Sequence, residues 1–144
     1  KPGRPLKFGT IGGRPVFGLP GNPVSTMVCF YLYVRPALRR MSARSDLGLP
    51  RIQARCATDI TLANNLTEFV RVRLERRDGE VYATPTGNQS SGVLRTLSRA
   101  NGLLIGPARE RLLEAGTQAA VLLLDTGAAA STAAYFEARL RQAN

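Results

Sequence analysis

The sequence GLPGNPVS, residues 18–25, decides how the first part of the chain folds. It follows a short apolar run and opens a long one, so the order predicts a strand, a tight turn and a helix. Asn22 is a good N-cap residue, and Pro23 suits the first helical position, where its missing N–H loses no hydrogen bond. The free N–H groups of Val24 and Ser25, the Ser25 hydroxyl and the positive helix end would then favour an anion. A plain strand–helix turn is the alternative, because many α/β connections look like this.

The segments on either side of this turn predict a hairpin and a buried helix. Residues 8–11 and 15–19 are typical of two short strands, joined by a turn at Gly12-Gly13. The helix expected from Pro23 to about Met41 is apolar nearly all round in its first half, which indicates burial. Pro36 lacks an N–H, so it is expected to kink this helix or to begin a new one.

A change of apolar period marks the second half of the chain. From residue 51 onward, apolar and polar residues alternate with a period of two, which is typical of strands with one buried face. Strands are expected at residues 51–56, 70–75, 81–84, 102–105 and 119–124. Arg77-Asp78-Gly79 is a strong hairpin signal between two of them. The pattern predicts a small, mostly antiparallel, partly closed β-barrel.

Two polar features accompany these strands. Arg71 and Arg73 alternate with apolar residues, so they are expected on a solvated face of the sheet. The polar loop 86–92, Thr-Gly-Asn-Gln-Ser-Ser-Gly, precedes a short amphipathic helix for which a serine is the expected N-cap.

Composition excludes several kinds of site. The chain of 144 residues has a net charge of +10, with 44% hydrophobic and 21% charged residues, as in a globular protein. It contains no histidine, which removes Ser-His-Asp triads and His-ligated zinc. Cys29 and Cys56 lie in apolar runs and are expected to be buried thiols, which fits a reducing, cytoplasmic setting. The positive charge favours a small anionic partner. We expect no nucleic-acid partner and no membrane partner, because basic runs and long apolar runs are absent.

Several spaced motifs, in order, are those of one known family. Lys1-Pro2-Gly3-Arg4-Pro5 opens the chain, Gly12-Gly13 follows, and then come residues 18–25 and Val34-Arg35-Pro36-Ala37-Leu38. From residue 1 to about residue 125, the chain closely resembles the molybdenum-insertion enzymes of molybdenum cofactor biosynthesis. These enzymes form the MoeA family, to which the E domain of gephyrin also belongs.

The resemblance implies an α/β remnant followed by a small, mostly antiparallel β-barrel domain. Residues 1–42 would be the C-terminal part of a MogA-like molybdopterin-binding α/β domain, and residues 43–50 a linker. Residues 51–125 would be the C-terminal β-barrel domain of the MoeA family, and residues 126–144 a tail with a short helix. Because the chain begins inside a family motif, we expect a C-terminal fragment of a longer protein. Its helix would have lost part of its sheet and would expose apolar surface.

The resemblance also implies a reaction and its partners. Adenylylated molybdopterin and molybdate would give molybdenum cofactor and AMP in the full-length enzyme, a homodimer that uses a divalent metal, usually Mg²⁺. We expect the fragment alone to be inactive, because the acidic metal ligands of this family lie upstream of Lys1. The ten acidic residues of the chain form no metal-ligand pattern. The alternative is a non-catalytic binding or assembly module of the same family.

Site residues carried over from the family lie in three places. Lys1 and Pro2 belong to the opening motif, where a lysine can supply positive charge to molybdate or phosphate. The turn would line the substrate pocket with Pro20, Gly21, Asn22, Pro23 and Ser25. Ser25 is the best single hydroxyl donor to an oxyanion. Ser91 matches the T-G-x-Q-x-S loop of the family, where it would either reach molybdate from the other wall or cap the following helix.

Leu66 departs from the family pattern. Family members commonly carry an arginine two residues before the pair that corresponds to Glu68-Phe69. The barrel would therefore lack a cation for oxyanion binding, unless Arg71 or Arg73 replaces it.

Overall fold

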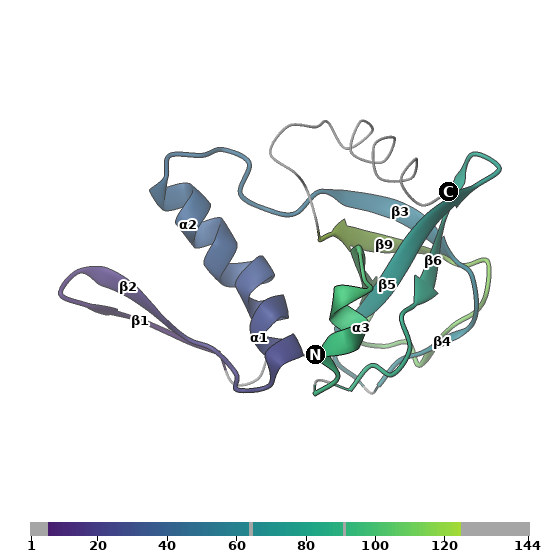
Figure 1. The fold of residues 1–144 in the computed structure, drawn as a ribbon, viewed down its shortest axis with the longest axis horizontal. Coiled ribbons are helices and arrows are strands. Elements are labelled where there is room, and N and C mark those ends of the chain that lie inside the picture. Colours follow the sequence, from purple (N-terminus) through teal and green to yellow (C-terminus); the bar gives the residue numbers. More distant parts are fainter. Residues whose placement is uncertain (1–5, 64, 91, 125–144) are drawn as a thin grey trace.

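The computed structural model describes residues 6–63, 65–90 and 92–124, in which a hairpin and a long helical segment lie beside a β-barrel (Figure 1). Strands β1 (Lys7–Ile11) and β2 (Arg14–Gly18) pair antiparallel, with Lys7 opposite Gly18. Gly12 and Gly13 both have positive φ, 54° and 75°, as a two-residue hairpin turn requires. The expected hairpin is therefore confirmed.

The helical segment is continuous but changes its winding in the middle. It consists of α1 (Pro23–Cys29), the π-helical turn η1 (Phe30–Val34) and α2 (Arg35–Met41). The Arg35 N–H donates to the Phe30 carbonyl, five residues earlier. Since Pro36 has no N–H to donate, the widened turn lets the helix continue where an ordinary hydrogen bond is missing. The distortion expected at Pro36 thus lies in the turn before it.

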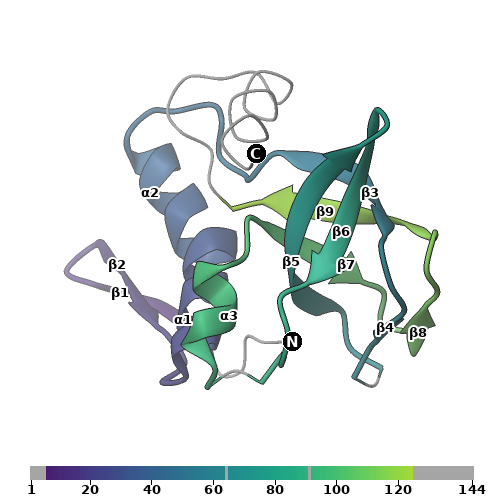
Figure 2. The ribbon, with the colours of Figure 1, turned by 45° about the vertical axis from the view of Figure 1, so that its right-hand side comes forward.

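The barrel has five strands in the closed order β3-β6-β5-β7-β9 (Figure 2). Their bounds are β3 (Arg51–Cys56), β5 (Glu68–Arg77), β6 (Glu80–Pro85), β7 (Gly102–Gly106) and β9 (Gln118–Leu123). The β3–β6 pair is parallel and the other pairs are antiparallel, which confirms a mostly antiparallel barrel. The barrel is closed rather than partly closed, because β9 pairs with β3 from Arg51↔Leu122 to Arg55↔Gln118.

Smaller elements complete the barrel. The short strands β4 (Ile60–Thr61) and β8 (Leu112–Leu113) form a separate antiparallel ribbon. Helix α3 (Leu94–Ser98) lies between β6 and β7 in the sequence. The predicted hairpin turn joins β5 to β6, with φ of 51° at Asp78 and 84° at Gly79.

Two apolar clusters organise the packing. One fills the barrel interior and includes Val72, Leu104 and Val121, each 0% exposed. The other lies between the barrel and the helical segment, where Val24 and Val28 pack in one cluster with Leu103 of β7. Successive residues of a strand point to opposite faces, so β7 can supply Leu104 to one cluster and Leu103 to the other.

The first part of the helical segment is buried, as predicted, and the second part is more exposed. Val24, Ser25, Val28 and Cys29 are buried, but Tyr33 and Met41 are 50% and 63% exposed. The expected exposed apolar surface is therefore present on the helix. Cys29 and Cys56 are buried and free, as predicted. Burial raises the pKa of both thiols.

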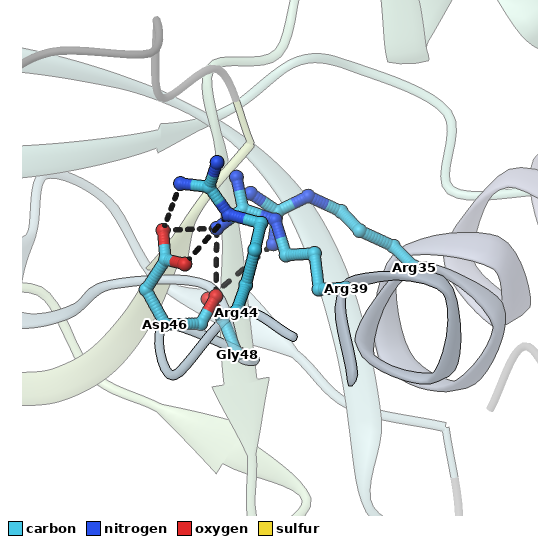
Figure 3. A network of polar contacts seen from close by, with 5 residues as sticks. All are labelled: Arg35, Arg39, Arg44, Asp46 and Gly48. Carbon is cyan, nitrogen blue, oxygen red and sulfur yellow. Dashed lines mark hydrogen bonds and ion pairs between the residues drawn. The ribbon is translucent and has the colours of Figure 1, made fainter. Parts of the chain in front are cut away.

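Arg35 and Arg39 of the helical segment bind the linker that leads into the barrel, and Arg44 of the linker joins the same network (Figure 3). Arg44 donates from Nε and Nη2 to the two carboxylate oxygens of Asp46, at 2.8 and 2.9 Å. Arg39 forms an ion pair with the same carboxylate and also donates to the Asp46 carbonyl at 2.6 Å. Arg35 donates to the Gly48 carbonyl at 3.3 Å. The hydrogen bonds from Arg44, with help from Arg39, hold the pKa of Asp46 well below its usual range.

Two predictions about the ends of the chain stay predictions. The part before the barrel is a hairpin and one helical segment, and its assignment to a MogA-like domain stays a prediction. The tail 126–144, with its expected short helix, lies outside the described residues. None of the helices within the described ranges has both the length and the apolar character needed to cross a membrane.

Candidate functional site

A side chain from the first turn of α1 binds the backbone of the turn that precedes the helix. Asn22 occupies the N-cap position with an extended backbone, φ −69° and ψ 125°, but its side chain makes no capping hydrogen bond. The Thr26 hydroxyl instead donates to the Pro20 carbonyl and lies 3.0 Å from the Asn22 carbonyl oxygen. The predicted N-cap position is therefore right, whereas the predicted capping interaction is wrong, because Thr26 reaches back over the turn.

Ser25 is buried, as are Pro20 and Val24 in the same turn. The residue is 4% exposed, whereas Gly21, Asn22 and Pro23 are exposed. No group within the described residues forms a hydrogen bond with the Ser25 hydroxyl. Buried polar groups normally have partners, so Ser25 stays a candidate donor at this turn.

The polar loop is anchored on β5 through Arg71. The Arg71 backbone N–H donates to Oε1 of Gln89 at 2.9 Å, and Nε2 of Gln89 donates back to the Arg71 carbonyl at 3.2 Å. The Thr86 N–H also donates to that carbonyl, at 3.0 Å. The loop therefore lies against β5 and binds the backbone N–H and carbonyl of Arg71, as a neighbouring strand would. Sequence reasoning did not identify Thr86, Gln89 or Thr96 as loop anchors.

Arg71 corrects a prediction. We expected its side chain on a solvated sheet face, but the residue is only 1% exposed. On one face of β5, Val70 and Val72 enter the barrel interior, and on the other face the loop and α3 cover Arg71. Arg73 is exposed, as expected.

Arg71 does not take the place of the arginine that the family pattern has at Leu66. The Arg71 guanidinium donates hydrogen bonds to Thr96 and to two loop carbonyls, so its donors are used within the protein. Leu66, at the position where the family pattern has an arginine, is 44% exposed.

The serine cap expected for the following helix is not formed. Helix α3 begins at Leu94 with Val93 at the N-cap position and no capping side chain. The N-cap position is therefore occupied by Val93 and not by a serine, and both alternatives for Ser91 stay predictions. Ser91 itself, like Lys1 and Pro2, lies outside the described residues.

The turn and the polar loop lie on the same side of the barrel. The N-terminal end of α1 and helix α3 are neighbours in both views (Figures 1 and 2). Val24 of α1 and Leu97 of α3 belong to one apolar cluster. The fold thus brings the helices that follow two of the selected places side by side, from segments about seventy residues apart in the sequence.

Other kinds of site find less support. No group of three or more potential metal ligands occurs within the described residues. An open cleft of about 350 Å³ lies against β3 and β9, lined among others by Arg51, Gln53 and Glu110. None of the site residues selected from the sequence lines this cleft.

Comparison with known proteins gives a consistent result. Residues 53–124 match the model of the MoeA C-terminal region, domain IV. The chain is 38% identical over 111 residues to the molybdenum cofactor synthesis protein cinnamon of Drosophila melanogaster, covering 76% of this chain and 18% of that protein. It is 36% identical over 118 residues to molybdopterin molybdenumtransferase 2 of Mycobacterium tuberculosis, covering 82% of this chain and 29% of the relative.

A solved structure agrees with these sequence matches. The molybdopterin biosynthesis MoeA protein of Pyrococcus horikoshii superposes with a TM-score of 0.66 at 28% identity. The match covers 85% of this chain and 30% of that protein. The chain therefore spans less than a third of the length of these three relatives.

Proposed function

The chain belongs to the MoeA family, and we propose that it is the C-terminal part of a molybdopterin molybdenumtransferase. The full-length enzyme would insert molybdate into adenylylated molybdopterin, giving molybdenum cofactor and AMP. This chain would supply one wall of the substrate pocket with the turn at residues 18–25 and the other with the loop at residues 86–92.

One observation carries this proposal beyond the family match. Helices α1 and α3, which follow the turn and the polar loop in the sequence, pack beside each other. A pocket for molybdate needs hydrogen-bond donors that converge from more than one element, because the oxyanion presents oxygen atoms in several directions. Two such segments on one side of the barrel satisfy that requirement.

The proposed chemistry is positioning and charge neutralisation. The Ser25 hydroxyl would donate to an oxyanion, and the N–H groups at the start of the helical segment would add partial positive charge. Lys1 would supply a full positive charge, Pro2 would shape the backbone beside it, and Ser91 would approach from the barrel side. Pro20, Gly21, Asn22 and Pro23 would shape the pocket wall.

The metal is assigned elsewhere. The described residues do not fit a Mg²⁺ site, because no three acidic or thiol side chains come together among them. The metal ligands would lie in the part of the longer relatives that this chain does not span. A homodimer, a cytoplasmic location and the absence of nucleic-acid and membrane partners complete the proposal.

A chimera tests the proposed reaction. The chain replaces its matching segment in molybdopterin molybdenumtransferase 2 of Mycobacterium tuberculosis, and AMP release from adenylylated molybdopterin is measured as molybdate is varied. We expect molybdate-dependent AMP release. A hydrogen bond to a charged group is worth about 1.5–3 kcal/mol, so Ser25→Ala should lower kcat/KM by roughly 10- to 150-fold. Ser45→Ala, an exposed serine in the linker, is the matched control and should leave the rate unchanged.

A non-catalytic binding module is the second candidate function. The exposed Leu66, where the family pattern has an arginine, favours it because the barrel then lacks that cation. A chimera that binds molybdate but releases no AMP would support this candidate and contradict the transferase. Restoring AMP release with Leu66→Arg would show that this departure alone removed the activity.

A further inference from the structure

Arg71 is buried to a degree that is unusual for a charged residue. It is 1% exposed, and charged side chains are rarely fully buried unless they are paired. Burial lowers the pKa of Arg71, although an arginine remains charged in a protein. Such burial is tolerated only where several acceptors replace the lost water, so the partners of Arg71 indicate its role.

The partners of the guanidinium all belong to the polar loop and the helix that follows it. Nε donates to Oγ1 of Thr96 at 2.8 Å, and Nη2 donates to the carbonyls of Asn88 at 3.0 Å and Ser90 at 3.2 Å. No carboxylate in the described part of the chain forms an ion pair with Arg71. The guanidinium therefore donates to neutral oxygen atoms of the loop and α3, and the charge of Glu68 acts on it without an ion pair.

Thr96 extends this connection into α3. Its hydroxyl accepts the hydrogen bond from Arg71 and donates its own proton to the Val93 carbonyl at 2.7 Å. Thr96 is itself 6% exposed, and its carbonyl accepts a hydrogen bond from the Thr86 hydroxyl at 2.8 Å. Thr86 at the start of the loop and Ser90 near its end are therefore both bound to the buried pair Arg71 and Thr96.

We propose that Arg71 is a positioning residue that fixes the loop at residues 86–90 in its substrate-binding conformation without touching the substrate. The inference rests on the proposed function, since Ser91, assigned above to the substrate pocket, directly follows Ser90. The planar fork of arginine donates in two directions at once, which holds two carbonyls and a hydroxyl in fixed relative positions. A lysine retains the charge but cannot reproduce that geometry.

Arg71→Lys in the chimera separates charge from geometry. We expect the KM for molybdate to rise by roughly 10- to 100-fold, because small displacements of positioning groups cost about that much, while the KM for adenylylated molybdopterin stays within about twofold. Amide hydrogen exchange of residues 86–90 should accelerate in the same variant. A Lys variant with wild-type KM values and wild-type exchange would overturn the inference.

Substitutions at Thr96 test the same positioning role if the Arg71→Lys variant does not fold. Thr96→Val removes the Nε acceptor at nearly constant volume, and Thr96→Ser restores the hydroxyl. We expect Val to raise the KM for molybdate and Ser to return it to within about threefold of the wild type, with melting temperatures that differ little between the two. Equal KM values for Val and Ser would contradict the inference.

The two proposals fail in different ways. If the unmutated chimera releases no AMP, the proposed function fails whatever Arg71 does. If the chimera is active and neither Arg71→Lys nor Thr96→Val changes its KM for molybdate, only the positioning role fails.

Discussion

The barrel and the hairpin–helix part of the chain differ in how they bury apolar side chains. Val72 and Leu104 in the barrel are fully buried. In the hairpin, Phe8 and Ile11 are 66% and 72% exposed, and at the end of the helix Met41 is 63% exposed. Both parts contain large apolar side chains, so what surrounds these side chains decides whether they are buried.

Closure explains the difference. Each barrel strand has a neighbour on both sides, so both backbone edges and one side-chain face are satisfied within the barrel. Strands β1 and β2 have only each other, and a lone two-stranded hairpin is marginally stable in water. The barrel is therefore expected to be stable by itself, whereas the hairpin and α2 depend on contacts that the described residues do not provide.

Removing a buried leucine from the barrel should have the largest effect. Leu104→Ala leaves a cavity among fully buried neighbours and should lower the free energy of unfolding by about 2–5 kcal/mol. Urea unfolding followed by circular dichroism measures it. The same change at Leu38, which is 48% exposed, should cost less than about 1 kcal/mol. Equal losses at the two positions would contradict the contrast between the two parts.

A methyl group added in β7 should have the next largest effect. A Cβ at Gly102 would lie 2.7 Å from Cγ1 of Val121 and 2.9 Å from Cδ1 of Leu74. Gly102→Ala should therefore cost about 1–3 kcal/mol through overpacking, measured by thermal unfolding. Gly9→Ala in the hairpin is the control, since a Cβ there meets nothing within 4 Å. A Gly102→Ala protein as stable as the wild type would show that the barrel interior is looser than the structure indicates.

Local sequence signals were sufficient to predict most of the barrel. The period of two and the Asp78-Gly79 turn are short-range features, and both predictions are confirmed. Closure was underestimated because the β3–β9 pairing joins segments more than sixty residues apart. Pairing over such distances depends on strand tilt and stagger, which sequence patterns do not encode locally.

The site was harder to predict, for a related reason. Alternation placed Arg71 on the polar face of its strand, which is correct, but that face is covered by a loop and a helix that follow much later in the sequence. Gln89, whose amide binds the Arg71 backbone, was visible as part of a motif but its partner was not. A residue type and its spacing indicate the face of a strand, whereas burial depends on the rest of the chain.

The exposed apolar residues on the helix should make the chain associate. We expect the weight-average mass in sedimentation experiments to rise with concentration. Leu38→Lys should weaken that association by roughly fivefold, because burying part of a leucine contributes about 1 kcal/mol. Leu112→Lys adds the same charge at a residue that is 45% exposed beside the barrel, and it should have a smaller effect. A monomer at all concentrations, with no binding of an apolar dye, would contradict the prediction.

The smallest effect on stability is expected at Asp46, in the linker between the helical segment and the barrel. Asp46 has a lowered pKa in the folded chain, so its contribution to stability is complete above the unfolded pKa of about 3.9 and is lost as the pH falls through the folded value. Its side chain is 56% exposed, which keeps the contribution small.

Amide exchange in the linker can isolate this contribution. In the wild type, the Arg44 amide, which donates to the Arg39 carbonyl, should lose protection below about pH 4 after correction for intrinsic rates. Asp46→Asn should show the same loss already at pH 7, while the Val121 amide in the barrel stays protected. Glu75→Gln, which removes an exposed ion pair with Arg77 at the far hairpin, is the matched control and should not affect the linker. If Asp46→Asn left the Arg44 amide fully protected, the Asp46 carboxylate would not be a contact that holds the linker in place.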